Sequence, residues 1–150
     1  MSAPTDVKAP ATGGQLATFW LDGDLYGVEV EHVQEVLRSQ KLTRVPLAPA
    51  AVAGLINLRG QVVTAIELRE RLGRPPRAEG TDAVVIVVRL HGEAVSLLVD
   101  SIADVVDVVA ADFEAPPDTL EGQARDLIRG AYKLDGQLLL ALDVQKAVSA

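Results

Sequence analysis

The chain has 150 residues, of which 49% are apolar but only 3% aromatic, and its formal net charge is −7. A single domain of this length can bury a sizeable core, and here that core must be aliphatic. An acidic surface repels phosphate groups, which argues against binding to nucleic acid and to anionic membranes. The chain has no cysteine and two histidines. We therefore expect no disulfide, no metal site and no cofactor.

The first residues predict neither a targeting signal nor a membrane anchor. Residues 1–14 are rich in Pro, Thr, Gly and Ala and contain no apolar targeting core, so we expect a flexible tail. The longest strongly apolar run, residues 83–88, is far too short to span a bilayer. We therefore expect a cytoplasmic protein whose folded domain covers residues 15–150.

The chain opens with a predicted β-hairpin and a short helix. Residues 16–21 and 25–30 are apolar runs separated by Asp22-Gly23-Asp24, a sequence typical of a hairpin turn. In residues 31–37, Val33, Val36 and Leu37 recur at spacings of three and four. That periodicity predicts a short helix.

A second hairpin follows after a short strand and a turn-rich link. Residues 42–45 predict a strand that ends at Pro46. The hairpin pairs residues 55–58 with 62–67 around Arg59-Gly60. A helical turn is then expected over residues 68–72, before an exposed loop that contains Pro75, Pro76 and Gly80.

The second half of the chain repeats this arrangement. A third hairpin is predicted from residues 83–90 and 93–99 around His91-Gly92, and residues 100–109 continue as a helix or a strand. After an acidic connection, a fourth hairpin pairs residues 127–134 with 137–142 around Asp135-Gly136. A short helix over residues 143–148 ends the chain.

Comparison of the chain with itself indicates an internal duplication. Residues 54–69 align without a gap on residues 130–145, and five of the sixteen positions are then identical. Residues 23–36 align in the same way on residues 92–105. The order is therefore unit one, unit two, unit one and unit two. We expect two related, mostly antiparallel β units, each too small to be robust alone.

Several motifs, in order, resemble one known family. The segment Gly54-Leu55-Ile56-Asn57-Leu58-Arg59-Gly60, followed by a strand and Glu67-Leu68-Arg69, resembles the signature of CheW-like domains. Residues 28–37, which contain Val33-Gln34-Glu35, and residues 84–108 resemble two further elements of that family. The resemblance covers residues 15–150. One departure is Thr64, where the family often has Pro.

The resemblance implies an all-β fold of two intertwined five-stranded SH3-like barrels with short helices. It also implies a function. CheW-like adaptors link the cytoplasmic tips of methyl-accepting chemotaxis receptors to the regulatory domain of the histidine kinase CheA in bacterial signalling arrays. We expect a chain that is monomeric on its own and is recruited to membrane receptor arrays without inserting into the membrane.

The resemblance also selects residues for partner binding. Glu35 and Arg59 are expected to form a charged pair near the junction of the barrels. Val33, Gly54 and Leu55 are candidate walls of a receptor groove. Asn57 and Gly60 belong to the same hairpin, where an Asn can also cap the turn and a Gly serves the turn itself. No residue is assigned to the kinase.

Two other functions remain as alternatives, and we do not expect an enzyme. The adaptor can serve a non-flagellar chemosensory pathway, such as one for pilus motility. A generic SH3-like peptide-binding module would need an aromatic-lined groove, for which five aromatic residues are few. An enzyme is disfavoured, because Ser39, Ser96 and Ser101 lack a nucleophile motif and His32 and His91 lie in no metal-binding motif.

Overall fold

The structure is a computed structural model that describes residues 14–120 and 122–149. The predicted flexible tail of residues 1–14 therefore lies outside the described residues, except for Gly14, which is the first residue of strand β1.

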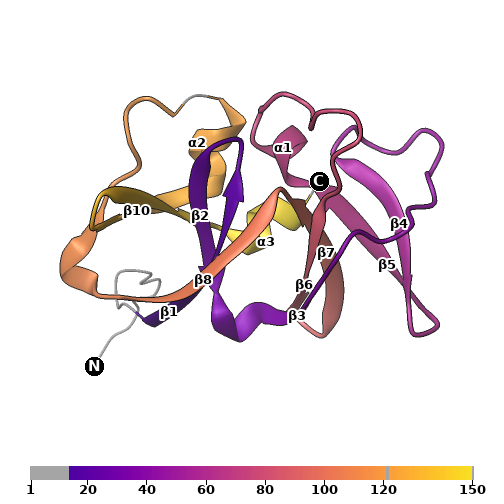
Figure 1. Ribbon diagram of the computed structural model, residues 1–150, viewed down its shortest axis with the longest axis horizontal. Helices are drawn as coiled ribbons and strands as arrows, with labels where there is room; N and C mark the ends of the chain where they lie inside the picture. The colour runs from indigo at the N-terminus through magenta and orange to yellow at the C-terminus, as the bar shows by residue number, and fades with distance from the viewer. Residues whose placement is uncertain (1–13, 121, 150) are drawn as a thin grey trace.

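Eleven strands form two sheets, which lie side by side in Figure 1. The first sheet has the order β8-β1-β2-β11-β10-β9, and the second has the order β3-β6-β7-β5-β4. The first sheet consists of β1 (Gly14–Leu21), β2 (Asp24–Glu29), β8 (Ser101–Val108), β9 (Phe113–Glu114), β10 (Ile128–Leu134) and β11 (Gln137–Leu142). The second consists of β3 (Val33–Leu37), β4 (Val52–Leu58), β5 (Gln61–Glu67), β6 (Val84–Leu90) and β7 (Glu93–Val99).

Short helices connect or follow the strands. They are the 3₁₀ turns η3 (Val30–His32) and η4 (Ala110–Asp112) and the α-helices α1 (Leu68–Arg71), α2 (Gln123–Leu127) and α3 (Val144–Val148). The all-β fold and all four hairpins predicted from the sequence are confirmed. Helices α1 and α3 lie in the two predicted terminal helical turns.

The two sheets are intertwined, because each combines strands from both halves of the duplication. Strand β3 follows β2 in the chain but pairs with β6, and β8 follows β7 but pairs with β1. In Figure 1 both strands can be followed across the middle of the molecule. The parallel pairs β2–β11 and β5–β7 then join the two kinds of unit within each sheet.

The strand registers confirm the duplication. In the β4–β5 hairpin Val52 is opposite Ile66, and in the β10–β11 hairpin the repeat-equivalent residues Ile128 and Leu142 are opposite each other. Both hairpins contain an irregularity at the next step of the ladder, before Gly54 and before Gly130. The hairpins β1–β2 and β6–β7 also have matching registers under the second alignment of the chain with itself.

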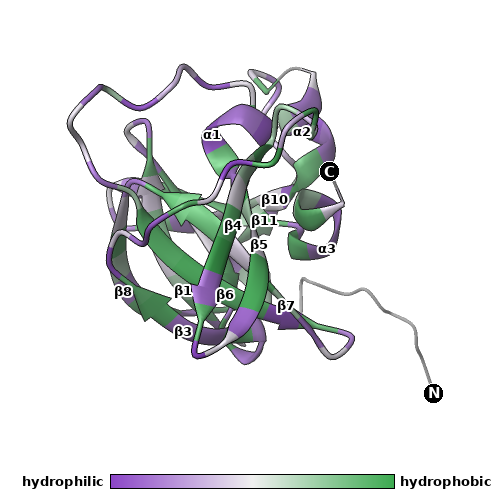
Figure 2. Ribbon diagram, turned by 90° about the vertical axis from the view of Figure 1, so that its right-hand side faces the viewer, coloured by the Kyte–Doolittle hydropathy of each residue, from purple (hydrophilic) through white to green (hydrophobic). Residues whose placement is uncertain are grey.

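One core cluster joins the two sheets. It contains Phe19 and Tyr26 from the first sheet and Ile86 and Leu97 from the second, all of them almost completely buried. Phe19 and Tyr26 stack with ring centres 5.9 Å apart. In Figure 2 the strands of the second sheet are coloured largely hydrophobic, whereas α1 is coloured largely hydrophilic. A shared core of this kind stabilises both units together.

The helix predicted for residues 31–37 is wrong. After the 3₁₀ turn, residues 33–37 form strand β3, in which Val33, Glu35 and Leu37 are half-buried and the residues between them are exposed. Val36, which contributes to the helical spacing, is 43% exposed. Pairing with β6 therefore overrides a short accidental periodicity.

Three smaller differences concern the connections. Residues 42–45 form no strand and contribute only a bridge between Thr43 and Leu55. Residues 100–109, for which the sequence leaves helix and strand open, contain strand β8. Strand β9 and helix α2 are not predicted from the sequence, because each is short and its neighbours carry polar and Pro-rich sequence.

Candidate partner-binding site

Glu35 and Arg59 form a bidentate ion pair between two distant elements. Arg59 Nη1 donates to Glu35 Oε2 at 2.7 Å, and Nη2 donates to Oε1 at 2.6 Å. Glu35 lies on β3 and Arg59 on the β4–β5 turn, and β3 and β4 are the two edge strands of the second sheet. The pair therefore links the two edges of this barrel.

Each member of the Glu35–Arg59 pair stabilises the charged form of the other. The hydrogen bonds from Arg59 lower the pKa of Glu35, and those to Glu35 raise the pKa of Arg59. The side chain of Arg59 is 71% exposed and that of Glu35 is 20% exposed. Because the guanidinium remains mostly in solvent, it is also available to a partner molecule.

The turn that carries Arg59 is held in a conformation that ordinary residues avoid. Arg59 has φ +51° and Gly60 φ +85°, so both central residues are left-handed, as expected for this tight turn. Asn57 Oδ1 accepts a hydrogen bond from the Gly60 N–H at 2.9 Å, which confirms that Asn57 caps the turn. The sequence Asp135-Gly136 favours a positive φ at both residues of the equivalent turn, but only Gly136 has one.

Gly54 and Leu55 lie earlier in β4 than Asn57, beside the segment that contains Thr43. The Leu55 N–H donates to the Thr43 carbonyl at 2.8 Å, and the Thr43 N–H donates to the Leu55 carbonyl at 2.9 Å. A Cβ on Gly54 would lie 2.6 Å from the Thr43 oxygen, and Gly54 has φ +153°. Glycine is thus required by the close approach of two backbones.

Val33 is half-buried and packs against the core cluster shared by the sheets. The structure therefore brings Glu35, Asn57, Arg59 and Gly60 together at one turn. Gly54 and Leu55 lie beside Thr43, and Val33 packs toward the core. The roles of these residues in partner binding remain a prediction.

A second charged cluster is not predicted from the sequence. Arg69 donates to both carboxylate oxygens of Asp100, at 2.9 and 2.6 Å, and Arg77 bridges Asp100 and Glu67 at 3.1 and 2.8 Å. Asp100 also accepts from the Asp22 N–H at 2.8 Å. These bonds outweigh desolvation and lower the pKa of Asp100 to about 2. The cluster connects the β1–β2 turn to the end of β7.

The sequence holds one signal for this cluster. Glu67-Leu68-Arg69 stands out as a motif, but the roles of Arg77 and Asp100 depend on a loop whose path only the structure shows. In that loop Arg74 also pairs with Asp22 at 3.2 Å and donates to Tyr26 Oη at 3.1 Å. The cluster is structural in its geometry, because the side chains of Arg69 on α1 and Arg77 on the loop are each only 12% exposed.

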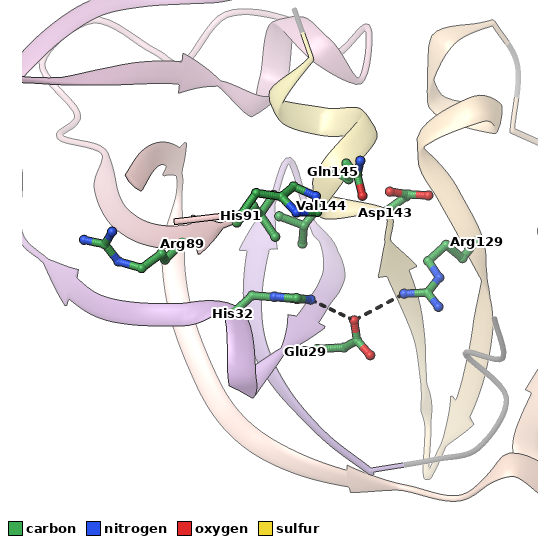
Figure 3. A pocket seen from close by; sticks show the side chains of 9 residues that line it. Glu29, His32, Arg89, His91, Arg129, Asp143, Val144 and Gln145 are labelled. Atoms are coloured by element: carbon green, nitrogen blue, oxygen red, sulfur yellow. Dashed lines mark hydrogen bonds and ion pairs between the residues drawn. The ribbon is translucent and has the colours of Figure 1, made fainter. Parts of the chain in front are cut away.

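Both histidines line one cavity of about 720 Å³ (Figure 3). In its lining, Glu29 lies between the His32 imidazole, at 3.2 Å, and the Arg129 guanidinium, at 3.4 Å. His91 enters from the β6–β7 turn, and Asp143 precedes α3. Asp143 is used locally, because it accepts the Lys146 N–H at the start of that helix.

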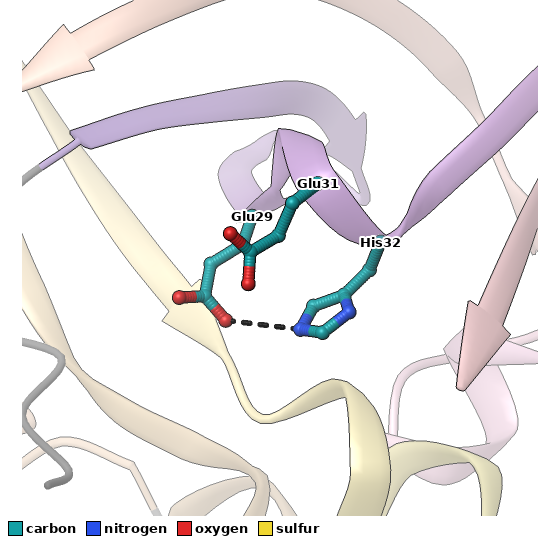
Figure 4. A group of neighbouring side chains, drawn as sticks. All are labelled: Glu29, Glu31 and His32. Atoms are coloured by element: carbon teal, nitrogen blue, oxygen red, sulfur yellow. Dashed lines mark ion pairs between the residues drawn. The ribbon is translucent and has the colours of Figure 1, made fainter. Parts of the chain in front are cut away.

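Glu29, Glu31 and His32 lie close enough together to suggest metal ligands (Figure 4). One ligand atom from each lies within 4.8 Å of the others. However, the Arg129 guanidinium already neutralises Glu29 and would repel a cation. The geometry therefore assigns no metal to this group.

Within residues 14–120 and 122–149, no helix is long and apolar enough to cross a membrane.

The fold defines a class: duplicated proteins in which two small barrels exchange an edge strand and share one core. The sequence profile of the CheW-like domain matches residues 15–150. The chain belongs to the CheW-like domain family, and the resemblance seen in its motifs is confirmed.

Named relatives and a solved structure agree with this family assignment. Chemotaxis protein CheW of Treponema pallidum is 30% identical over 140 residues, which cover 91% of this chain and 82% of that protein. Chemotaxis protein CheW of Klebsiella aerogenes is 28% identical over 150 residues, covering 100% and 90%. The crystal structure of the scaffolding protein TtCheW from Thermoanaerobacter tengcongensis matches with a TM-score of 0.77 and 28% identity, covering 88% of this chain and 90% of that one.

Proposed function

We propose that this chain is a chemotaxis coupling protein, a non-enzymatic scaffold that links methyl-accepting receptors to the histidine kinase CheA. The observation that carries the proposal is the match of a whole double-barrel fold, over 88% of the chain, to a scaffolding protein. Chemotaxis proteins of the same family align along nearly the full chain.

The candidate site fits a scaffold. Arg59 presents a mostly exposed guanidinium on a rigid turn, and its partner Glu35 fixes its direction. Such a group can recognise a carboxylate on a partner without a chemical step. In our proposal the partner surface comprises Val33, Glu35, Gly54, Leu55, Asn57, Arg59 and Gly60, and the chain works in the cytoplasm beside receptor arrays.

Co-sedimentation tests the proposal. Membranes that carry the cognate receptor are mixed with the purified chain, with the kinase, or with both, and the pellets are analysed. We expect the chain to pellet with receptor membranes and the kinase to pellet efficiently only when the chain is present. Sedimentation of the kinase to the same extent with and without the chain would contradict the proposal.

A further inference from the structure

One stretch of this acidic protein has a net positive charge because it contains no acidic residue. Residues 36–66 contain no Asp or Glu but contain Arg38, Lys41, Arg44 and Arg59. This stretch carries +4 in a chain of −7, so all the other residues together carry −11. Arg59 is paired with Glu35, whereas Arg38, Lys41 and Arg44 are exposed and make no ion pair with any residue that the structure describes.

Exposed apolar side chains gather in the same stretch. Within the described part of the chain, five of the nine large apolar residues that are exposed lie between residues 36 and 66. They are Val36, Leu42, Val45, Leu47 and Val62. Three of these five belong to residues 38–48, which we call the basic loop. A surface that combines free cations with exposed apolar groups is typical of a binding site rather than of an inert face.

Leu47 at the tip of the basic loop is exposed and strained. Its relative accessibility is 103%, so it contacts almost nothing in its own chain. It has φ +65° in a turn where the Ala48 N–H donates to the Val45 carbonyl at 3.3 Å. With Pro46 before it, Leu47 occupies the turn position that favours Gly or Asn. A leucine here therefore strains the turn and gains no stabilisation from burial in its own chain.

The basic loop is nevertheless held in place. Thr43, which lies shortly before Leu47, forms two backbone hydrogen bonds to Leu55 on β4, at 2.9 and 2.8 Å. Pro46 restricts the backbone next to the tip. The tip is therefore pre-organised, which reduces the entropy lost when a partner binds.

We propose that Leu47 is a docking anchor that inserts into an apolar pocket on a partner protein, and that carboxylates around that pocket pair with Arg38, Lys41 and Arg44. Binding energy concentrates at side chains that fill well-packed, desolvated pockets, and complementary charges around such a pocket add specificity and a faster association rate. The strain at Leu47 is then explained, because the residue is selected for binding and not for folding.

A protein fits this site better than a lipid surface does. An anionic membrane would attract three cations but would be repelled by the net −11 of the remaining chain. Only one apolar side chain projects fully from the loop, and a fluid bilayer gives no advantage to a rigid turn. The inference rests on the proposed function, because the partner is sought among the proteins of a receptor–kinase complex.

The test uses Leu47→Asn, with His91→Asn as a matched control. His91 is also exposed and has φ +51° in a turn, so Asn should relieve strain at both positions. We expect each variant to raise the Tm by about 2–4 °C. Only Leu47→Asn should weaken binding, by about tenfold or more. Binding is measured separately to a receptor cytoplasmic fragment, to the kinase regulatory domain and to phosphatidylserine vesicles.

The outcomes separate the two proposals. Weaker binding of Leu47→Asn to one of the two proteins, with normal binding of His91→Asn, supports the anchor. Lys41→Gln with Arg44→Gln should then reduce the salt dependence of that binding. Unchanged affinity for both proteins, a lowered Tm for Leu47→Asn, or Leu47-dependent binding to vesicles would overturn the anchor. A wild-type chain that binds neither protein would instead refute the proposed function.

Discussion

Arg59 shows how a single residue can be placed for a partner at some expense to the fold. Its backbone is left-handed, a conformation in which Asn or Asp is better tolerated. Its guanidinium reaches across the barrel to Glu35, which neither of those shorter side chains can do. The tight-turn conformation could be predicted from the sequence Arg59-Gly60, and so could the partner Glu35, although the sequence pattern places Glu35 on a helix.

Replacing Arg59 should therefore separate coupling from folding. We expect Arg59→Asn to keep a Tm within a few degrees of the wild type, because Asn suits the turn while an exposed ion pair is lost. Kinase activation in a receptor–kinase reconstitution should fall by about tenfold or more, since the oriented fork is lost. Asn is preferred to Asp here, because a new carboxylate would face Glu35. Full activation by Arg59→Asn would show that Arg59 is only a turn residue.

Ser96 offers a second prediction at the scale of a residue. Its hydroxyl is buried in β7 and has no hydrogen-bond partner within the described structure. Burying a hydroxyl without a partner is unfavourable, so Ser96→Ala should raise the free energy of unfolding by about 1 kcal/mol. Urea denaturation measures the change, and Ser101→Ala, at an exposed position, should have almost no effect. A destabilised Ser96→Ala protein would mean that the hydroxyl has a partner after all.

At the scale of elements, the duplicated hairpins have glycine at the same position because a backbone oxygen of a neighbouring segment approaches it closely in both. A Cβ on Gly54 would meet the Thr43 oxygen at 2.6 Å, and one on Gly130 would meet the Glu114 oxygen at 2.5 Å. In both barrels a neighbouring segment crosses the hairpin closely at this point. The internal repeat in the sequence predicts that the two hairpins are equivalent, but not which segment packs against each one.

Substitution at these glycines should reveal the same constraint in both barrels. We expect Gly54→Ala and Gly130→Ala each to lower the free energy of unfolding by about 1–3 kcal/mol, because a backbone oxygen cannot move aside cheaply. Gly80→Ala, with φ +85° but open space around the position, should lose only about 1 kcal/mol. A Gly130→Ala variant that lost no more free energy of unfolding than Gly80→Ala would contradict the close approach of β9.

For the whole molecule, the cluster around Asp100 predicts how stability depends on pH. The pKa of Asp100 is about 2 in the folded protein, below its ordinary value of 3.8. Its ionised form therefore stabilises the fold above about pH 4, and this contribution is lost as the pH falls toward 2. Asp100→Asn should lower the free energy of unfolding by about 1–2 kcal/mol at pH 7.

Urea unfolding between pH 7 and pH 2 measures this effect. The difference between wild type and Asp100→Asn should be largest at neutral pH and should shrink below pH 4. Asp82→Asn is a suitable control, because Asp82 is exposed and makes no ion pair with a described residue. A difference that stays constant down to pH 2 would assign the effect to packing and not to the charge of Asp100.

The sequence predicts more of the whole architecture than of its connections. Apolar runs separated by Gly-bearing turns are enough to predict the four hairpins, and the gap-free internal alignments are enough to predict two related units. The exchange of β3 and β8 between the sheets follows only from family resemblance, because no local pattern states which edge a strand will join. The charge cluster escapes prediction for the same reason, since Arg77 and Asp100 meet only after the chain has folded.

Our central claim is that this chain couples a receptor to a kinase, and the most direct measurement is the rate of kinase autophosphorylation in a defined reconstitution. Receptor-bearing membranes, kinase and the chain are combined singly, in pairs and all together. We predict a large increase in rate only when all three are present, and a return to the basal rate when the receptor ligand is added. A rate that is the same with and without the chain, in preparations where all three proteins are folded, would contradict the account.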